Sequence, residues 1–276
     1  MASVAVVIVL VIVASSAYLR QTSMRINCPD WPMCAQRIAG QDAEHAPPAL
    51  VGAVRLAHRL SATIAGVAVM LIFFLTVAHR PRLRADLALS AAIIVLTVFL
   101  AVLGRWSRAS QGPLITLGNL LGGLTLLALL QWMRLRTSPI HAAPEDAGRL
   151  APVAVIALAL AFVAIALGAL VSFDQSISTA HAASEGVFAF THLFTGVLML
   201  LLTGTLALHP AAGRTERRIG ITAFVLAILQ ALTGWLSIRF GYPLPAALAH
   251  NLLAAFLLIA LETVAYRCAG AARAQH

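Results

Sequence analysis

Long apolar stretches alternate with short polar segments along the whole chain. A helix of about 20 apolar residues crosses the hydrocarbon core of a bilayer. Stretches of this kind cover residues 2–19, 50–78, 86–104, 113–134, 151–171, 187–208, 217–237 and 245–266. The first has no basic leader before it, so we expect a retained helix rather than a signal peptide. The pattern predicts an all-α membrane protein with eight transmembrane helices.

Composition leads to the same class of protein. Of the 276 residues, 61% are hydrophobic and 11% are charged, and the mean hydropathy is +0.91. Soluble domains are far less apolar than this. The net charge of +9 comes from arginine alone. No basic soluble surface is left to carry it, so nucleic acid is excluded as a partner and membrane lipid is the expected surrounding.

The arginines predict the orientation in the membrane. They concentrate in the segments after the second, fourth, sixth and eighth apolar stretches. Cytoplasmic loops carry an excess of basic residues, so we expect both termini to be cytoplasmic. The first outward loop, with Arg20, Arg25 and Arg37, is an exception to this pattern.

A faint repeat divides the chain into two halves. Residues 112–123 resemble residues 241–255, and His58 corresponds to His192. Duplication of this kind is common in polytopic membrane proteins. The repeat predicts two pseudo-symmetric four-helix bundles, an N-terminal domain of residues 1–140 and a C-terminal domain of residues 141–276.

Three histidines inside the spans are the strongest candidates for chemistry. His58, His192 and His250 each lie five to eight residues past the start of an inward-running helix, about 8–12 Å below the outer surface. His192 and His250 are therefore level within one half. Two level imidazoles in a four-helix bundle suit axial ligation of a heme iron. Alternatively, each histidine hydrogen-bonds a neighbouring helix.

The surroundings of these histidines differ between the halves. Arg239 is the basic residue of the outward loops of the second half. It could hold heme propionates or be an ordinary interfacial arginine. His58 has no histidine partner, because the equivalent place reads Thr116-Leu117-Gly118-Asn119. An amide is a poor iron ligand beside imidazole, so we expect an open or degenerate site in the first half.

Two of the three cysteines lie in the first outward loop. Cys28 and Cys34 are separated by five residues that include two prolines. An oxidising compartment favours their pairing, and the short loop that would result is geometrically feasible. Cys268 falls near the cytoplasmic end and is expected to stay reduced.

Several of these motifs resemble one protein family. The run from Cys28 to Cys34, His58-Arg59, and Pro243-Leu244-Pro245 leading to His250 are together similar to heme A synthases, a family of cytochrome oxidase assembly proteins. The resemblance covers nearly the whole chain. It implies eight helices in two bundles in a bacterial inner membrane, and oxidation of the heme O methyl group to the formyl group of heme A.

The resemblance also implies roles for particular residues. A resident heme b would be held by His192 and His250, and the heme O substrate by His58. Arg55 stands where the family has a glutamate, and Asn119 where it has a second histidine. Cys28 and Cys34 would form the outer-loop disulfide. Heme O synthase or cytochrome oxidase subunits are the implied partners.

The two replacements leave three hypotheses open. In the first hypothesis, the chain is an atypical active synthase, with Arg55 anchoring a propionate and His58 as the sole ligand. Alternatively, it is a non-catalytic heme-binding assembly protein of cytochrome oxidase. Outside the family, it is a small transporter or a b-type electron carrier.

Overall fold

Eight long helices form the part of the chain that the structure describes. The computed structural model describes residues 1–24, 48–78, 84–106, 113–138, 143–177, 182–240 and 243–273. The helices are α1 (Ala2–Met24), α3 (Pro48–Ala78), α4 (Arg84–Trp106), α5 (Pro113–Thr137), α6 (Ala151–Ile177), α7 (Ala182–Leu208), α8 (Arg214–Arg239) and α9 (Leu244–Arg273), and a short 3₁₀ helix, η2 (Glu145–Leu150), precedes α6.

All eight helices are long and apolar enough to cross a membrane. The prediction of an all-α protein with eight spans is thereby confirmed. Helices suit this setting because their backbone groups are hydrogen-bonded within the helix, where lipid offers no partner. The helices run past the predicted apolar stretches; α9, for example, continues to Arg273. Polar residues continue a helix where it leaves the hydrocarbon core.

Local sequence sets several helix ends. Proline occupies the first position of α3 and of α5, where its missing N–H has no helical partner to lose. Gly213 caps the start of α8. The carbonyl of Pro243 accepts a hydrogen bond from the Ala247 N–H at 3.1 Å, at the start of α9.

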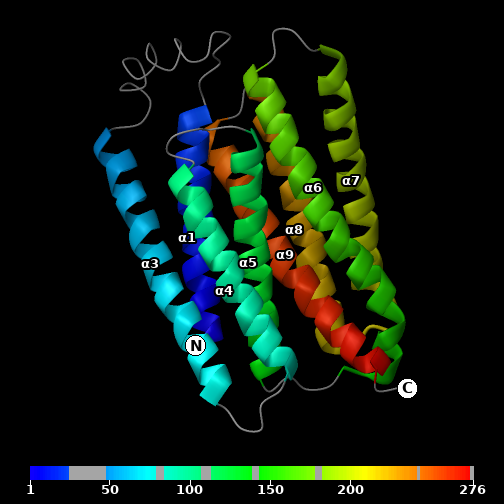
Figure 1. Cartoon of the computed structure of the whole chain (residues 1–276). Coiled ribbons are helices and arrows are strands. Elements are labelled where there is room, and N and C mark those ends of the chain that lie inside the picture. The colour runs from blue at the N-terminus through cyan, green and yellow to red at the C-terminus, as the bar shows by residue number, and fades with distance from the viewer. Residues whose placement is uncertain are drawn as a thin grey trace.

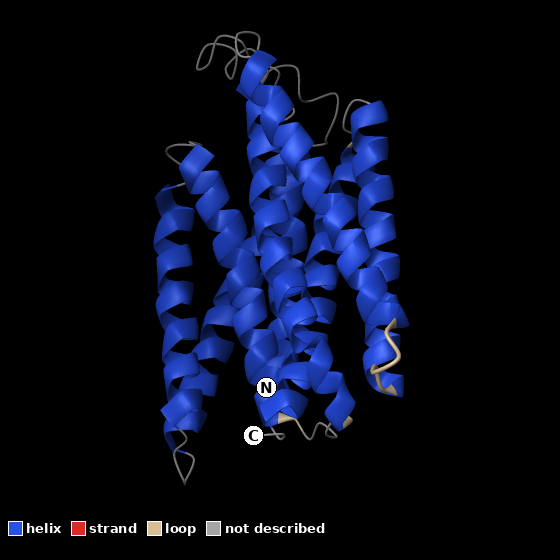
Figure 2. Ribbon diagram, turned by 90° about the vertical axis from the view of Figure 1, so that its right-hand side faces the viewer, coloured by secondary structure: helices blue, strands red, loops and turns tan. Residues whose placement is uncertain are grey.

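The helices pack side by side, with the two termini at the same end (Figures 1 and 2). In the first half each helix contacts the next in the order α1, α3, α4, α5, and α5 also contacts α1. In the second half the order is α6, α7, α8, α9, and α9 also contacts α6. These contacts divide the eight helices into two groups of four. The division into domains 1–140 and 141–276 and the pseudo-symmetry remain predictions.

Helix α9 is the main link between the two groups of helices. It contacts α1 and α5 in addition to α6 and α8, and it runs obliquely, passing behind α5 in Figure 1. Near one end, Arg20 Nη2 donates to Asn251 Oδ1 at 3.1 Å. Toward the other end, Gln131 Nε2 donates to Thr263 Oγ1 at 2.9 Å. Polar contacts therefore fix α9 against the first half at two heights.

A buried ion pair joins α8 to α9 at the end that holds the termini. Arg267 Nε lies 2.7 Å from Glu216 Oε1, and only 10% and 1% of the two side chains are exposed. Each buried charge is thereby matched by an opposite one. This pair holds the lower ends of the two helices together.

Candidate functional site

Two of the three predicted histidines lie next to each other. The ring centroids of His192 on α7 and His250 on α9 are 6.4 Å apart, and their planes are inclined by 63°. Two imidazoles on opposite sides of one iron, each bonded at about 2.0 Å, have ring centres about 6 Å apart. The observed separation therefore fits a pair of axial heme ligands.

Helix α8 holds the ring of His250 in one orientation. Its Nδ1 atom lies 3.0 Å from the backbone oxygen of Gln230, and a carbonyl oxygen can only accept. Nδ1 therefore carries the proton, and Nε2 keeps the lone pair. A Cβ atom added at Gly234 would lie 3.1 Å from Cε1 of His250, so the glycine lets the ring approach the α8 backbone.

Helix α6 receives His192 in a similar way. A Cβ atom added at Gly168 would lie only 2.9 Å from Cε1 of this ring, which is closer than real Cβ contacts. The backbone of Ala164, four residues before Gly168, lies near the ring. Gln230 likewise precedes Gly234 by four residues. Both imidazoles thus pack on a glycine that follows a nearby backbone group by about one helical turn.

The buried polar atoms around the pair also fit a heme. The Nδ1 atom of His192 is buried and, among the described residues, has no hydrogen-bond partner within ordinary limits. A Cβ atom at Gly196, one turn after His192, would meet nothing within 4 Å. The described residues contain no cluster of three or more metal-ligating side chains. Heme iron needs only two axial ligands from the protein, because the porphyrin supplies the other four.

The third histidine lies in the first half and contacts a different partner. The Nδ1 atom of His58 on α3 lies 3.0 Å from the hydroxyl oxygen of Ser15 on α1. That hydroxyl also lies 2.8 Å from the Val11 carbonyl, to which it donates. The Ser15 oxygen is then the acceptor for His58, so Nδ1 carries the proton and Nε2 keeps its lone pair. This is the tautomer that a metal ligand needs.

Two arginines lie close to His58 along α3. Arg55 precedes His58 by three residues and precedes Arg59 by four, spacings at which side chains are neighbours on a helix surface. Both arginines are exposed. Arg55 is therefore the cation that an anionic group bound beside His58 would meet on the same face.

Leucine side chains of α4 pack against the segment of α5 that the predicted repeat matches with the surroundings of His250. A Cβ atom at Gly118 would lie 3.0 Å from Leu103 Cδ2, and one at Gly122 only 2.7 Å from Leu100 Cδ2. Both leucines come from α4 and pack tightly on α5. No second imidazole lies here, since the neighbouring polar residue is Asn119.

The remaining predicted residues lie apart from the histidine pair. Arg239, the expected propionate partner, is exposed at the end of α8, with its guanidinium 5.8 Å from the centroid of the Phe240 ring. Cys28 and Cys34 lie outside the described residues. Cys268 is buried and free in the described part of the chain, and its staying reduced remains a prediction.

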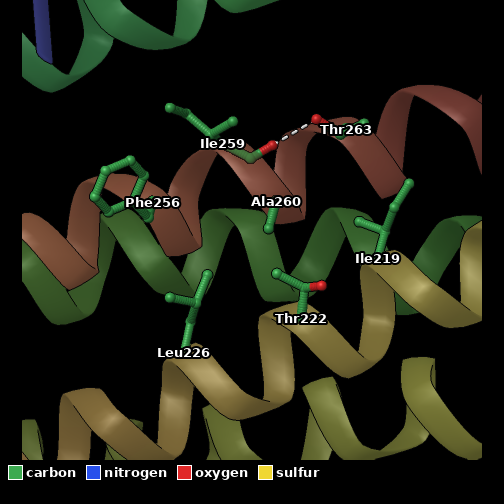
Figure 3. Close-up of a pocket in the computed structure, with 7 residues that line it drawn as sticks. All are labelled: Ile219, Thr222, Leu226, Phe256, Ile259, Ala260 and Thr263. Carbon is green, nitrogen blue, oxygen red and sulfur yellow. Dashed lines mark hydrogen bonds between the residues drawn. The ribbon is translucent and has the colours of Figure 1, made fainter.

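A surface groove between α8 and α9 is separate from these sites. Its volume is about 410 Å³, and it is lined by Ile219, Thr222, Leu226, Phe256, Ile259, Ala260 and Thr263. Figure 3 shows these side chains converging from the two helices, with the Thr263 hydroxyl bonded to the Ile259 carbonyl. No histidine lines the groove, and most of its wall is apolar.

The fold and the site together define a polytopic membrane protein with a histidine pair that fits heme iron. The sequence model of the cytochrome oxidase assembly protein family matches residues 1–261 of this chain. The chain belongs to this family. It is also 26% identical to the heme A synthase of Shewanella oneidensis, over an alignment of 313 positions that covers 95% of this chain and 94% of that protein.

Sequence reasoning missed several residues that contact the histidines. They include Ser15, Gly168, Gln230, Thr233 and Gly234. Gln230 carried a signal, because an amide inside a membrane span is costly unless it has a partner. The serine and the glycines carried none, since small residues occur at many helix contacts in membranes.

Proposed function

We propose that this chain is a heme A synthase, an oxidoreductase that converts the heme O methyl group to the formyl group of heme A for cytochrome oxidase. The observation that carries the proposal is the pairing of His192 with His250 at 6.4 Å in a member of the cytochrome oxidase assembly family. The name of the similar Shewanella protein supports the same reaction.

Each half has its own role in this proposal. His192 and His250 hold the iron of a resident heme b in the second half. His58, oriented by Ser15, is the single protein ligand to heme O in the first. Arg55 binds a propionate there, and Arg239 does so in the second half. Arg55 and Arg239 are exposed near their helix ends, where a propionate reaching the outer surface would meet them.

The protein supplies position and surroundings, while the hemes supply the redox chemistry. Oxidising a methyl to a formyl group requires an electron acceptor that side chains do not provide. His58 fixes the distance of the substrate ring from the α1 and α3 backbones. Apolar side chains of the spans exclude water from the reacting edge.

The proposal extends to the surroundings of the protein. The arginine distribution supports an orientation with both termini in the cytoplasm, and the family resemblance supports a bacterial inner membrane. Cys28 and Cys34 form a disulfide in the outward loop. Heme O synthase or cytochrome oxidase subunits are the partners that would deliver heme O or receive heme A.

A second candidate function is supported by the first half. Asn119 stands where the resemblance leads us to expect a second histidine, and Leu103 packs tightly against the adjacent Gly118. A protein that holds heme in the second half without oxidising heme O would be a non-catalytic assembly protein.

Heme extraction separates the two functions. The chain is expressed in cells that make heme O but have no other heme A synthase, and extracted hemes are separated by chromatography. Accumulation of heme A supports the synthase. Heme O without heme A, with a b-type heme still bound to the purified protein, supports the assembly protein.

A further inference from the structure

One residue, Gln230, contacts both nitrogens of His250. Its backbone oxygen lies 3.0 Å from Nδ1, and its side-chain Nε2 lies 3.1 Å from Nε2 of the ring. The first contact places the proton on Nδ1. In the second contact the amide nitrogen must therefore donate, and the lone pair of the imidazole accepts.

This arrangement has two opposite effects on metal binding. The backbone contact selects the tautomer in which Nε2 can bind a metal, and such contacts also orient and strengthen histidine ligands. The side-chain contact uses the same lone pair that iron would need. An iron atom and the Gln230 amide therefore compete for one nitrogen.

The side chain of Gln230 is held on only one side. Its Oε1 atom is buried and, within the described part of the chain, has no hydrogen-bond partner. By contrast, the backbone oxygen is fixed, because Gln230 lies in the interior of helix α8 and its main chain is part of the helix. The amide can therefore leave Nε2 at the expense of one hydrogen bond, while the contact to Nδ1 stays in place.

We propose that the Gln230 side chain occupies the coordinating nitrogen of His250 in the heme-free protein and is displaced when heme iron binds. Gln230 is thus a positioning residue that prepares His250 for the metal through its backbone and lowers the affinity for heme through its side chain. The inference rests on the proposed heme site between His192 and His250.

The competition is tested with hemin and heme-free protein. Wild type and the Gln230→Leu variant are purified in detergent from heme-deficient cells and titrated with hemin, with the Soret band as the readout. Gln230→Leu is expected to bind hemin about fivefold more tightly, the factor for one ordinary hydrogen bond. Its spectrum stays low-spin, because both histidines remain.

Two further variants make the result specific. Gln230→Asn shortens the side chain and withdraws the amide from Nε2, so it raises the affinity in the same direction and replaces the leucine variant if that one does not fold. Gln131→Leu removes another buried amide, one bonded to Thr263 and Arg134 rather than to histidine. This control keeps the wild-type affinity.

The outcomes separate the inference from the proposed heme site. Equal or weaker hemin binding by both Gln230 variants, with a low-spin spectrum in wild type, overturns the role of Gln230 alone. A loss of the low-spin spectrum in these variants does so as well, since the amide would then be required for ligation. Absence of a low-spin spectrum in wild type overturns the heme site itself.

Discussion

Gly168 lies directly against the imidazole of His192, so that a Cβ atom at this position would approach Cε1 to 2.9 Å. The ring can sit this close to α6 only because residue 168 has no side chain. The same holds for Gly234 and His250 at 3.1 Å. The two glycines thus set where both imidazoles stand, which makes them testable apart from the histidines.

Alanine at Gly168 or Gly234 is expected to weaken heme binding by displacing an imidazole. Overpacking of this kind typically costs about 1–3 kcal/mol, and retention of the low-spin heme through purification measures it. Gly66→Ala is the matched control, since nothing lies within 4 Å of a Cβ there. Unchanged heme content in both variants would contradict the role of the glycines.

Replacement of His192 by alanine should abolish the low-spin b-type optical signal, because iron would lose one of its two axial ligands. His58→Ala should leave this signal intact while removing any bound heme O or heme A. Optical spectra and extracted heme types of the two purified variants check both statements. Retention of the low-spin signal in His192→Ala would disprove the ligand assignment.

Ser15 orients His58, so Ser15→Ala is expected to lower the yield of heme A several-fold, as loss of one hydrogen bond of about 1 kcal/mol implies. The content of heme b should not change, because the second half is untouched. Ser237→Ala serves as the control, since its hydroxyl donates to Thr233 of its own helix. An equal heme A yield in the two variants would show that the Ser15 contact is not used.

Removal of Glu216 is expected to destabilise the protein strongly. Glu216→Ala leaves Arg267 buried without its partner, a change that costs about 3–5 kcal/mol in buried pairs. The exposed pair of Arg149 and Asp146, 3.8 Å apart with 75% and 71% of the side chains accessible, provides the comparison. Asp146→Ala should leave thermal unfolding in detergent almost unchanged, and similar midpoints for both variants would contradict the prediction.

Hydropathy was enough to predict the eight spans, because each helix must be apolar over the thickness of a bilayer. The pairing of His192 with His250 was also predictable in part, since depth along a helix follows from residue count. The number of residues does not say, however, which way each histidine side chain faces around its helix axis. Gln230 illustrates the limit: its contacts with His250 depend on how α8 and α9 cross, which no pattern in either helix specifies.

The contact between Arg20 and Asn251 was unpredictable for a similar reason. Arg20 was assigned to the first outward loop, whereas α1 continues through it to Met24. Its partner lies 231 positions away, and no repeat or spacing connects the two. Long-range contacts of this kind are set by the packing of whole helices rather than by local sequence.

Both the histidine pair and the contact of Arg20 with Asn251 depend on α9, the last helix of the described chain. During synthesis the membrane therefore receives seven helices before His250 arrives. A ribosome-bound intermediate cannot ligate iron from both sides, and a chain cut short before α9 would leave His192 alone. At the proposed heme site, both histidine ligands would therefore be present only after α9 has entered the membrane.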